Sequence, residues 1–352
     1  MATILDRPDV RVTRLAPDAV GTWRRIVDEL SQSTLAHSPE WFTVVRTAYG
    51  HEPLYLSAED RDGRPGLLPA FVIRRPVFGT VVTSMPFLDA GGPCSSSGAL
   101  AQALVEDLIG EAHHVGARVV ELRCTARLAL AAEPMEHKVN LTLDLPADSG
   151  SLWRQLDAGV RNQIRKAERS GLSVEFGGTE NLTAFYDVFA ARMRDLGSPV
   201  HASGFLRAVM DSFGDRARIA LARKGRTPVG GLVALAFKDR IAVPWAACLR
   251  DYLSLCPNML LYWEALRTAC VGGFRRFDFG RSTRDSGTYR FKRQWGAREE
   301  PLFWYTIPIH ARRRPAESRA SAVAVLLEHV WRRLPLAVTR RLGPPIRRYL
   351  TQ

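Results

Sequence analysis

The sequence has few of the features that mark metal-binding, disulfide-bonded or membrane-spanning proteins. Its five cysteines are scattered without a CxxC pair, and no His and Cys residues have the spacing of a zinc site. This pattern fits small core residues in a reducing compartment, so we expect a cytoplasmic protein with no bound metal. The start, MATILDRPDVRV, has no apolar run, and no stretch of the chain is apolar over the length of a bilayer span. We therefore expect neither a signal peptide nor a transmembrane helix.

Positive charge is concentrated at the end of the chain. The 352 residues carry a net charge of +13, and 46% of them are hydrophobic, which is ordinary for a packed globular body. Residues 311–352 hold ten arginines and two glutamates, so they contribute +8. A basic tail predicts an anionic partner, such as a membrane surface or a phosphorylated molecule.

Two parts of the chain share one order of predicted elements. LYLSAEDRDGRPGLLPAFVI (54–73) and IALARKGRTPVGGLVALAF (219–237) each predict a strand, a turn and a second strand. A third strand, a loop, a helix and a further strand follow in both copies, at a separation of roughly 160 residues, which indicates a duplicated domain. Two unrelated domains of similar order are the alternative.

The predicted boundaries follow from turn residues and tail composition. Pro, Asp, Gly and Ser cluster at 145–151, so we expect a first domain at 1–147, a second at 148–310 and a basic, amphipathic helical tail at 311–352. We expect one helix at 152–171 that ends at Gly171, a strand that ends at Asp278, and a last strand of the second domain at 302–308. The predicted class is α/β with mixed sheets.

The repeated unit resembles the GNAT acyltransferase fold, and the pair of units resembles the Fem family. Four segments carry the resemblance: HSPEWFTVVRTAYGHEP, VFGTVVTSMPFLDAGGP, RNQIRKAERSG and GTYRFKRQWG. MRDLGSPVH, FDFGRST and the tail are most similar to Fem-like proteins of bacterial exosortase and exopolysaccharide loci. The resemblance implies two GNAT-like domains that transfer an aminoacyl or acyl group to an amine of a phosphorylated or lipid-linked peptidoglycan, exopolysaccharide or other cell-envelope precursor. The alternative is a non-catalytic, membrane-docked component of exopolysaccharide assembly.

The acyl donor stays open between aminoacyl-tRNA and acyl-CoA. GNAT enzymes hold the coenzyme A pyrophosphate on a loop patterned Arg/Gln-x-x-Gly-x-Gly/Ala, at the N-terminus of a helix whose free N–H groups favour phosphate. The corresponding loops here, PCSSSGAL and SLCPNMLL, lack this pattern. Acetyl-CoA bound in the usual GNAT manner is therefore not favoured, and we expect no permanently bound cofactor.

The stretch FDFGRSTRDSGTYRFKRQWG (277–296) combines rings, cations and a flexible loop. Phe291 and Trp295 are four residues apart, so on a helical turn they share one face that can be buried. The Fem pattern then makes Lys292 the residue tied to transfer, where a fixed cation would stabilise an oxyanion. A surface lysine beside an aromatic anchor is the alternative, as is a plain strand-end carboxylate for Asp278. We assign catalytic roles to Lys292, Asp278, Tyr289 and Asp89, and loop contacts with substrate to Arg281, Ser282 and Thr283.

Further substrate contacts are predicted on a basic helix and a turn. Arg161, Arg165 and Arg169 fall at i, i+4 and i+8, with Asn162 and Lys166 on the adjoining stripe. Such like charges repel one another unless an anion relieves them, so a phosphate site is one interpretation and a solvated face the other. Asp89 and His201 are the candidate bases, and each could instead belong to a turn.

The tail predicts a helix with one apolar stripe. The stripe residues are Val323, Leu326, Leu327, Val330, Trp331 and Leu334, beside arginines. One interpretation is an anchor on the anionic inner face of the bacterial inner membrane. The other is that the stripe packs on the protein's own second domain.

Overall fold

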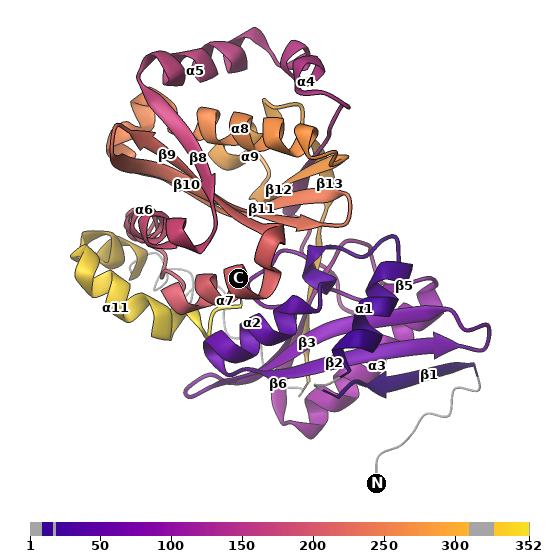
Figure 1. Ribbon diagram of the computed structural model, residues 1–352. Helices are drawn as coiled ribbons and strands as arrows, with labels where there is room; N and C mark the ends of the chain where they lie inside the picture. The colour runs from indigo at the N-terminus through magenta and orange to yellow at the C-terminus, as the bar shows by residue number, and fades with distance from the viewer. Residues whose placement is uncertain (1–8, 17–18, 310–326, 352) are drawn as a thin grey trace. The chain divides into compact units, whose positions relative to one another are not determined.

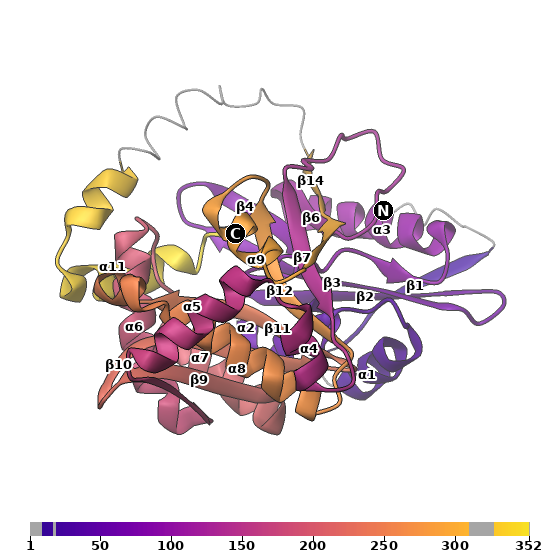
Figure 2. The same ribbon diagram turned by 90° about the horizontal axis from the view of Figure 1, so that it is seen from above.

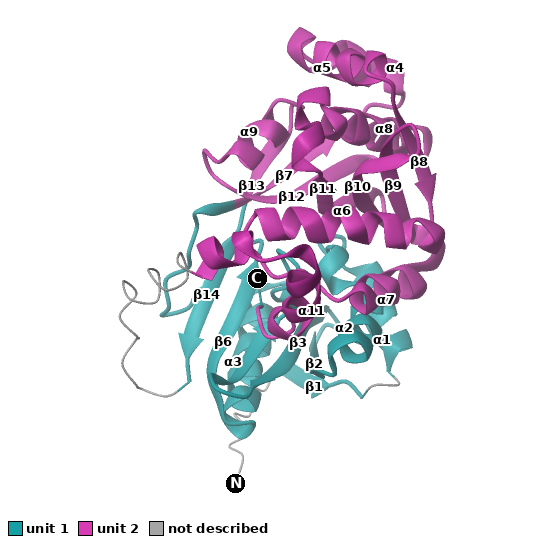
Figure 3. Ribbon diagram, turned by 90° about the vertical axis from the view of Figure 1, so that its left-hand side faces the viewer, with its two compact units in different colours: residues 1–138, 301–312, 351–352 teal, residues 139–300, 313–350 magenta. Residues whose placement is uncertain are grey.

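The protein forms two compact units, and a computed structural model describes residues 9–16, 19–309 and 327–351 (Figures 1 and 3). Unit 1 comprises Met1–Lys138, Pro301–Arg312 and Thr351–Gln352. Unit 2 comprises Val139–Glu300 and Arg313–Leu350. Each unit is built on one mixed sheet with helices on both faces.

The sheet of unit 1 has the order β1-β2-β3-β4-β6-β14, and β5 pairs with β3. β4 and β6 are parallel, and the other pairings are antiparallel. Its strands are β1 (Val10–Arg14), β2 (Glu52–Asp60), β3 (Pro65–Arg75), β4 (Gly79–Ser84), β5 (Cys94–Ser95), β6 (Ala117–Cys124) and β14 (Phe303–Pro308), and its helices are α1 (Val20–Glu29), η1 (Leu35–His37), α2 (Glu40–Tyr49) and α3 (Gly98–His114).

Side chains along β2 point alternately to the two faces of the sheet of unit 1, and both faces are packed. Leu54 and Leu56 are fully buried in the cluster that α3 completes. Tyr55, between them, points to the opposite face, where its ring lies 4.4 Å from that of Trp23 in α1 and 5.3 Å from that of Phe42 in α2. The strand is therefore apolar on both faces, as expected of a strand between two helical layers.

The sheet of unit 2 has the order β13-β7-β12-β11-β10-β9-β8. β11 and β12 are parallel, whereas β8, β9, β10 and β11 pair antiparallel in turn. Its strands are β7 (Lys138–Asp144), β8 (Leu172–Gly177), β9 (Ala217–Lys224), β10 (Thr227–Phe237), β11 (Arg240–Cys248), β12 (Arg276–Thr283) and β13 (Arg298–Pro301), and its helices are α4 (Ser149–Gln155), α5 (Ala158–Arg169), η2 (Thr179–Asn181), α6 (Leu182–Asp195), α7 (Ser203–Phe213), η3 (Gly214–Arg216), η4 (Arg250–Leu255), α8 (Pro257–Val271), α9 (Gly287–Arg293) and α11 (Leu336–Arg347).

Helix α8 is the centre of the larger core of unit 2. It lies between the sheet and the helices α4 and α5, with α6 on the opposite face of the sheet (Figure 1). Because α8 is covered on several sides, its apolar residues surround the helix instead of forming one stripe, and Leu261, Tyr262 and Leu266 are all buried. α5 contributes the narrower stripe Val160, Ile164 and Ala167.

The predicted repeat is confirmed in the order of elements. β2, β3, β4, α3 and β6 of unit 1 correspond to β9, β10, β11, α8 and β12 of unit 2, with the last two strands parallel in each case. The correspondence also extends upstream, since a strand and two helices precede each copy: β1, α1 and α2 in unit 1, and β8, α6 and α7 in unit 2.

The boundaries of the units differ from the predicted 147/148 and 310/311. β7 follows unit 1 in the sequence but lies beside β12 in the sheet of unit 2 (Figure 2), and β14 follows unit 2 but pairs with β6 of unit 1. The strand expected to end the second domain thus completes the first sheet. Turn residues at 145–151 mark the start of α4, where Asp148 accepts a hydrogen bond from the Ser151 N–H, and not a domain boundary.

Two further element boundaries were predicted wrongly. The single helix expected at 152–171 is divided into α4 and α5 at Leu156 and Asp157. α5 ends at Arg169, and the predicted stop residue Gly171 follows with φ +71°. β12 continues past Asp278 to Thr283. In the tail, residues 327–333 are helical and α11 follows, while Val323 and Leu326 of the predicted stripe lie outside the described residues.

Candidate functional site

Parallel strands β11 and β12 of unit 2 diverge partway along their length. Their pairing ends at Ala242 and Asp278, yet β11 continues to Cys248 and β12 to Thr283. In unit 1, β4 and β6 stay paired to Thr83 and Glu121, next to the last residue of β4. The strand opening, by which we mean the region beyond Ala242 and Asp278, therefore distinguishes unit 2 from unit 1.

The opening begins at a bend that the sequence Asp-Phe-Gly produces. The Asp278 carboxylate accepts a hydrogen bond of 2.7 Å from the Gly280 N–H, and Gly280 has φ +75°, which glycine adopts at low cost. The bend changes which side chains face inward, because Phe277 and Phe279 are buried and Ser282, not Arg281, is the next buried side chain. Asp278, predicted as catalytic, thus has a demonstrable role in shaping the strand.

Lys292 closes the bend from the facing helix α9. It is only 8% exposed, and its Nζ donates to the carbonyl oxygens of Gly280 (2.9 Å) and Arg281 (2.7 Å). A strand that has left its neighbour has carbonyl groups without ladder partners, and the ammonium group satisfies two of them. The arrangement places a buried cation at the strand opening, which is where a developing negative charge could be stabilised.

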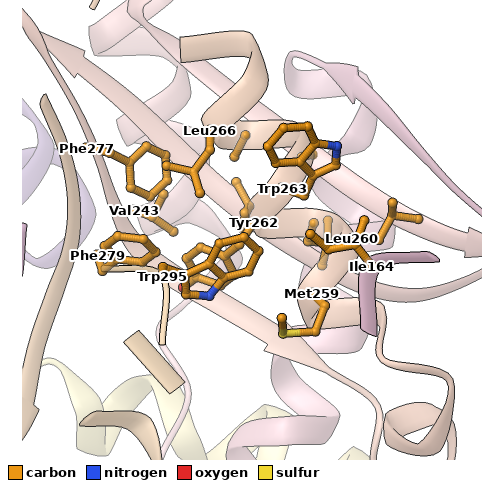
Figure 4. Packing of buried hydrophobic residues seen from close by; sticks show 14 of the residues in the cluster. Ile164, Val243, Met259, Leu260, Tyr262, Trp263, Leu266, Phe277, Phe279 and Trp295 are labelled. Carbon is orange, nitrogen blue, oxygen red and sulfur yellow. The ribbon is translucent and has the colours of Figure 1, made fainter. Parts of the chain in front are cut away.

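The predicted aromatic anchor holds α9 in place. Phe291 and Trp295 pack on Tyr262 of α8, with ring centroids 5.1 Å and 6.5 Å from the Tyr262 ring. Figure 4 shows Trp295 with Tyr262 and Phe279 in the core of unit 2. At its start α9 is capped by Ser286, whose Oγ accepts from the Tyr289 N–H at 3.2 Å. The shared face predicted from the four-residue spacing is confirmed.

Tyr289 belongs to a network with two residues that the sequence reading missed. Its hydroxyl donates a short hydrogen bond to Glu299, and the Arg284 Nε donates to the same carboxylate at 3.1 Å. The hydrogen bond raises the pKa of Tyr289 and lowers the pKa of Glu299, so a protonated phenol faces a carboxylate. The signal for Glu299 was its place in the acidic pair Glu299-Glu300, which follows a strongly basic segment.

The remaining loop candidates lie at the end of β12. Ser282 is buried, and its Oγ has no hydrogen-bond partner among the described residues. Arg281 is half-buried and Thr283 is exposed. An unpartnered buried hydroxyl is uncommon, and it marks the opening as a place where a bound molecule could supply an acceptor or donor.

The predicted arginine ridge lies on α5, but its members differ. The Arg161 Nη1 donates to carbonyl oxygens at the end of α4, including that of Arg154 at 3.3 Å, so this arginine caps the preceding helix. The Arg165 guanidinium lies 5.4 Å from the Trp153 ring centroid. Of the substrate contacts predicted on this helix, the exposed ones are Asn162, Arg165, Lys166 and Arg169. These four could meet an anion, whereas Arg161 has an evident structural function.

His201 is not at the strand opening. It is buried between Phe205, whose ring stacks at 4.4 Å, and the tail, where the Arg347 Nε donates to the His201 Nε2 at 3.0 Å. Burial first, and then the charge of Arg347, hold the pKa of His201 well below its usual range. Because Nε2 accepts a hydrogen bond, this imidazole is held neutral and is a poor candidate for the base.

Asp89 lies in unit 1, in the loop that follows β4. Met85 and Phe87 in this loop have φ +33° and +71°, which is uncommon for residues other than glycine. The loop is held by Arg123, a buried arginine that the sequence reading missed, whose Nη1 donates to the Leu88 carbonyl at 2.6 Å. The Asp89 carbonyl accepts from the Trp304 Nε1 at 3.1 Å.

The described part of the chain holds neither a metal cluster nor a membrane-spanning helix. Across residues 9–16, 19–309 and 327–351, no group of three or more His, Cys, Asp and Glu side chains could hold a metal ion. No helix in the same ranges is long and apolar enough to cross a bilayer.

Comparison with known protein families finds a similarity in unit 2. Residues 154–293 match the model of the acetyltransferase (GNAT) domain. This range contains α5, the diverging strands and α9, so this part of unit 2 is similar to an acetyltransferase domain of GNAT type. The sequence has no match among curated proteins.

Several solved structures share the fold along nearly the whole chain. FemX is similar at a TM-score of 0.62 and 12% identity, over 90% of this chain and 100% of that one. L-PGS from Bacillus licheniformis is similar at a TM-score of 0.55 and 12% identity, over 89% of this chain and 97% of that one. A tandem GNAT protein from the clavulanic acid biosynthesis pathway is similar at a TM-score of 0.54 and 11% identity, over 86% of this chain and 100% of that one. The fold is therefore the Fem-like, tandem GNAT fold that the sequence predicted.

Proposed function

We propose that the protein is an N-acyltransferase of Fem type, which transfers an aminoacyl or acyl group to an amine of a cell-envelope precursor. The observation that carries the proposal is the buried ammonium group of Lys292 at the strand opening, inside the segment that matches the GNAT domain. The similarity to FemX is consistent with it, and the Fem resemblance assigns the same lysine to transfer.

The proposed reaction needs little more than orientation and a fixed positive charge. The acceptor amine attacks the carbonyl carbon of an ester or thioester, a C–N bond forms, and the C–O or C–S bond breaks with release of the alcohol or thiol. The amine loses one proton and the leaving group gains one, so the reaction is balanced. Negative charge develops on the carbonyl oxygen between the attack of the amine and the loss of the leaving group. A preorganised cation stabilises this charge and so lowers the activation barrier of transfer.

Two residues were predicted as the proton acceptor. His201 is buried and accepts a hydrogen bond from Arg347, which disfavours it. Asp89, a carboxylate in the unit 1 loop that contains the positive-φ residues Met85 and Phe87, remains a separate prediction. An Asp89→Asn variant tests this separately from Lys292.

The proposed donor is aminoacyl-tRNA, with acyl-CoA as the competitor in the test. α8 begins with Pro257, which has no N–H, and the Met259 N–H already donates to the Cys256 carbonyl at 3.0 Å. The helix end that would meet a pyrophosphate in the usual GNAT manner therefore has few free donors. The exposed residues of α5 are proposed to bind acceptor phosphate.

The test is single-turnover transfer with radiolabelled aminoacyl-tRNA or acyl-CoA and a nucleotide-linked or lipid-linked peptidoglycan precursor. We expect a labelled amide with one donor and its loss in Lys292→Met. The absence of amide with both donors and both acceptors would contradict the proposal. Label transfer that persists unchanged in Lys292→Met would remove that residue from the mechanism.

A further inference from the structure

Helix α11 of the tail has two unlike faces. On one face, Thr339 and Gly343 are buried, and a Cβ on Gly343 would lie 3.0 Å from the Val200 backbone nitrogen. The Arg340 Nη1 donates to Asp187 at 2.6 Å, and Arg347 donates to His201. These contacts hold α11 on α6 and on the segment that follows it, within unit 2 (Figure 3).

The opposite face is apolar and exposed. It comprises Val338, Arg341, Leu342, Pro345 and Ile346, which fall at i, i+3, i+4, i+7 and i+8 and so form one continuous stripe. We call it the outer face. Val338, Leu342 and Ile346 are 37%, 46% and 42% exposed, although they have the helical spacing that usually indicates core packing.

The apolar surface continues on either side of α11. Leu327 and Val330, in the helical residues 327–333, are 62% and 51% exposed, and Leu350 is 40% exposed. Exposed aliphatic side chains are ordinary when they are scattered, but a run of them on one short segment marks an interaction surface.

Charge decides which partner fits this surface. Residues 327–351 contain six arginines and one glutamate. Arg333 and Arg341 are exposed and make no ion pair or hydrogen bond with any residue in the described part of the chain. A stripe of exposed aliphatic side chains on α11, with Arg341 within it, matches a lipid interface, where the apolar groups enter the acyl boundary and the guanidinium group reaches phosphate.

We propose that the outer face of α11 docks flat on an anionic phospholipid bilayer, while its inner face stays packed on unit 2. The sequence left a membrane anchor and packing on the protein's own body as alternatives for the stripe at 323–334. On α11, which follows that stripe, the two interpretations hold together on opposite faces of one helix. The inference does not depend on the transfer reaction, because it uses no residue of the strand opening.

A second exposed apolar site provides a matched control. Val77 and Phe78, in the turn between β3 and β4, are 80% and 72% exposed. The arginines beside them pair with Glu52 and Glu121, so this turn has apolar groups without the surplus of cations. It should contribute little to binding on an anionic surface.

The experiment is vesicle flotation of the full chain at low salt. Phosphatidylcholine vesicles are compared with vesicles that also contain phosphatidylglycerol. We expect the protein to float only with the anionic vesicles. Arg341→Glu should lower the partition coefficient by more than about fivefold, because the loss of one cation alone is worth about that much and the new carboxylate is repelled by the anionic surface. Leu342→Ser with Ile346→Ser should lower it about tenfold or more, because two aliphatic groups no longer enter the interface.

Two controls make the outcome decisive. Val77→Ser with Phe78→Ser removes apolar surface elsewhere, and Arg46→Glu reverses an exposed arginine on α2; both should float like the parent. Equal flotation with neutral vesicles, no flotation at all, or loss of flotation in the Val77/Phe78 variant would overturn the proposal. A dimer in sedimentation that the Leu342/Ile346 variant dissociates would also overturn it, since the outer face would then bind a second copy of the chain.

Discussion

The ammonium group of Lys292 lies 2.7 Å from the carbonyl oxygen of Arg281, a residue of the strand that has just left its parallel neighbour. The same contact satisfies a buried backbone group and fixes a positive charge at the strand opening. The local structure and the proposed chemistry therefore depend on one side chain, and a variant of Lys292 must be examined for both.

Lys292→Met should lower turnover about a hundredfold or more, because one fixed donor to the oxyanion is lost. It should also lower the free energy of unfolding by about 1–3 kcal/mol, since two buried carbonyl groups lose their partner. Single-turnover kinetics and urea denaturation measure the two effects.

Trp295→Phe is the matched control for Lys292. It leaves the ammonium group in place and creates a small cavity next to Tyr262, so it should cost about 1–2 kcal/mol of stability. Turnover at a temperature where both variants are folded should stay within about tenfold of the parent. Equal losses of activity in the two variants would mean that Lys292 acts only through stability.

Gly280→Ala should destabilise unit 2 by about 1 kcal/mol or more, because φ +75° is unfavourable for a residue with a Cβ. Gly110, in the middle of α3 with no atom within 4 Å of its potential Cβ, is the opposite case. Gly110→Ala should raise stability by about 0.5–1 kcal/mol through helix propensity. Thermal unfolding of both variants tests whether the bend needs a glycine at position 280. Changes in stability of the same sign in the two variants would contradict this requirement.

Stability should decrease on acidification because of His201. Its folded-state pKa is depressed, so below the ordinary value of about 6.5 the unfolded chain binds a proton that the folded chain does not. The stability that this group contributes is therefore complete above about pH 6.5 and falls as the pH drops toward the folded pKa. Urea unfolding should show that the free energy of unfolding decreases less between pH 8 and pH 5.5 in His201→Asn than in the parent. His114→Asn, at an exposed position, should behave like the parent.

The arginines of α5 should separate into two classes. Arg165→Gln with Arg169→Gln should raise the KM of a phosphorylated acceptor. The free energy of unfolding should stay nearly unchanged, since both side chains are exposed. Arg161→Gln should lower stability by about 1–3 kcal/mol, because the carbonyl groups at the end of α4 lose their donor. An unchanged KM in the double variant would identify the ridge as a solvated face.

The repeat and the anchor of α9 were predictable because both rest on local patterns. Hairpins with Gly-containing turns, and aromatic residues four apart, leave their mark within a short window. The same spacing rule placed Arg161, Arg165 and Arg169 on one helix correctly. It could not show that Arg161 folds back on α4, because that contact depends on where the preceding helix ends.

The failures concern contacts that form only where the chain turns back on itself. Glu299 reaches Tyr289 only because β13 returns beside β7, and His201 is covered only because the tail returns to α6. The assignment of β14 to the first sheet is of the same kind, since its sequence is compatible with an edge strand of either unit. The periodicity of a sequence predicts a strand and its buried face, but it does not predict which strand lies next to it in the sheet.

The crossing of β7 and β14 means that neither half of the gene encodes a complete sheet. A fragment that ends at residue 147 would contain β7 without its neighbour β12, and would leave the edge of β6 bare where β14 belongs. Bare edges recruit other strands, so such fragments should aggregate when expressed alone. Any duplication that gave rise to the chain therefore left two copies that became dependent on each other, and domain dissection of this protein has to follow the sheets and not the repeat.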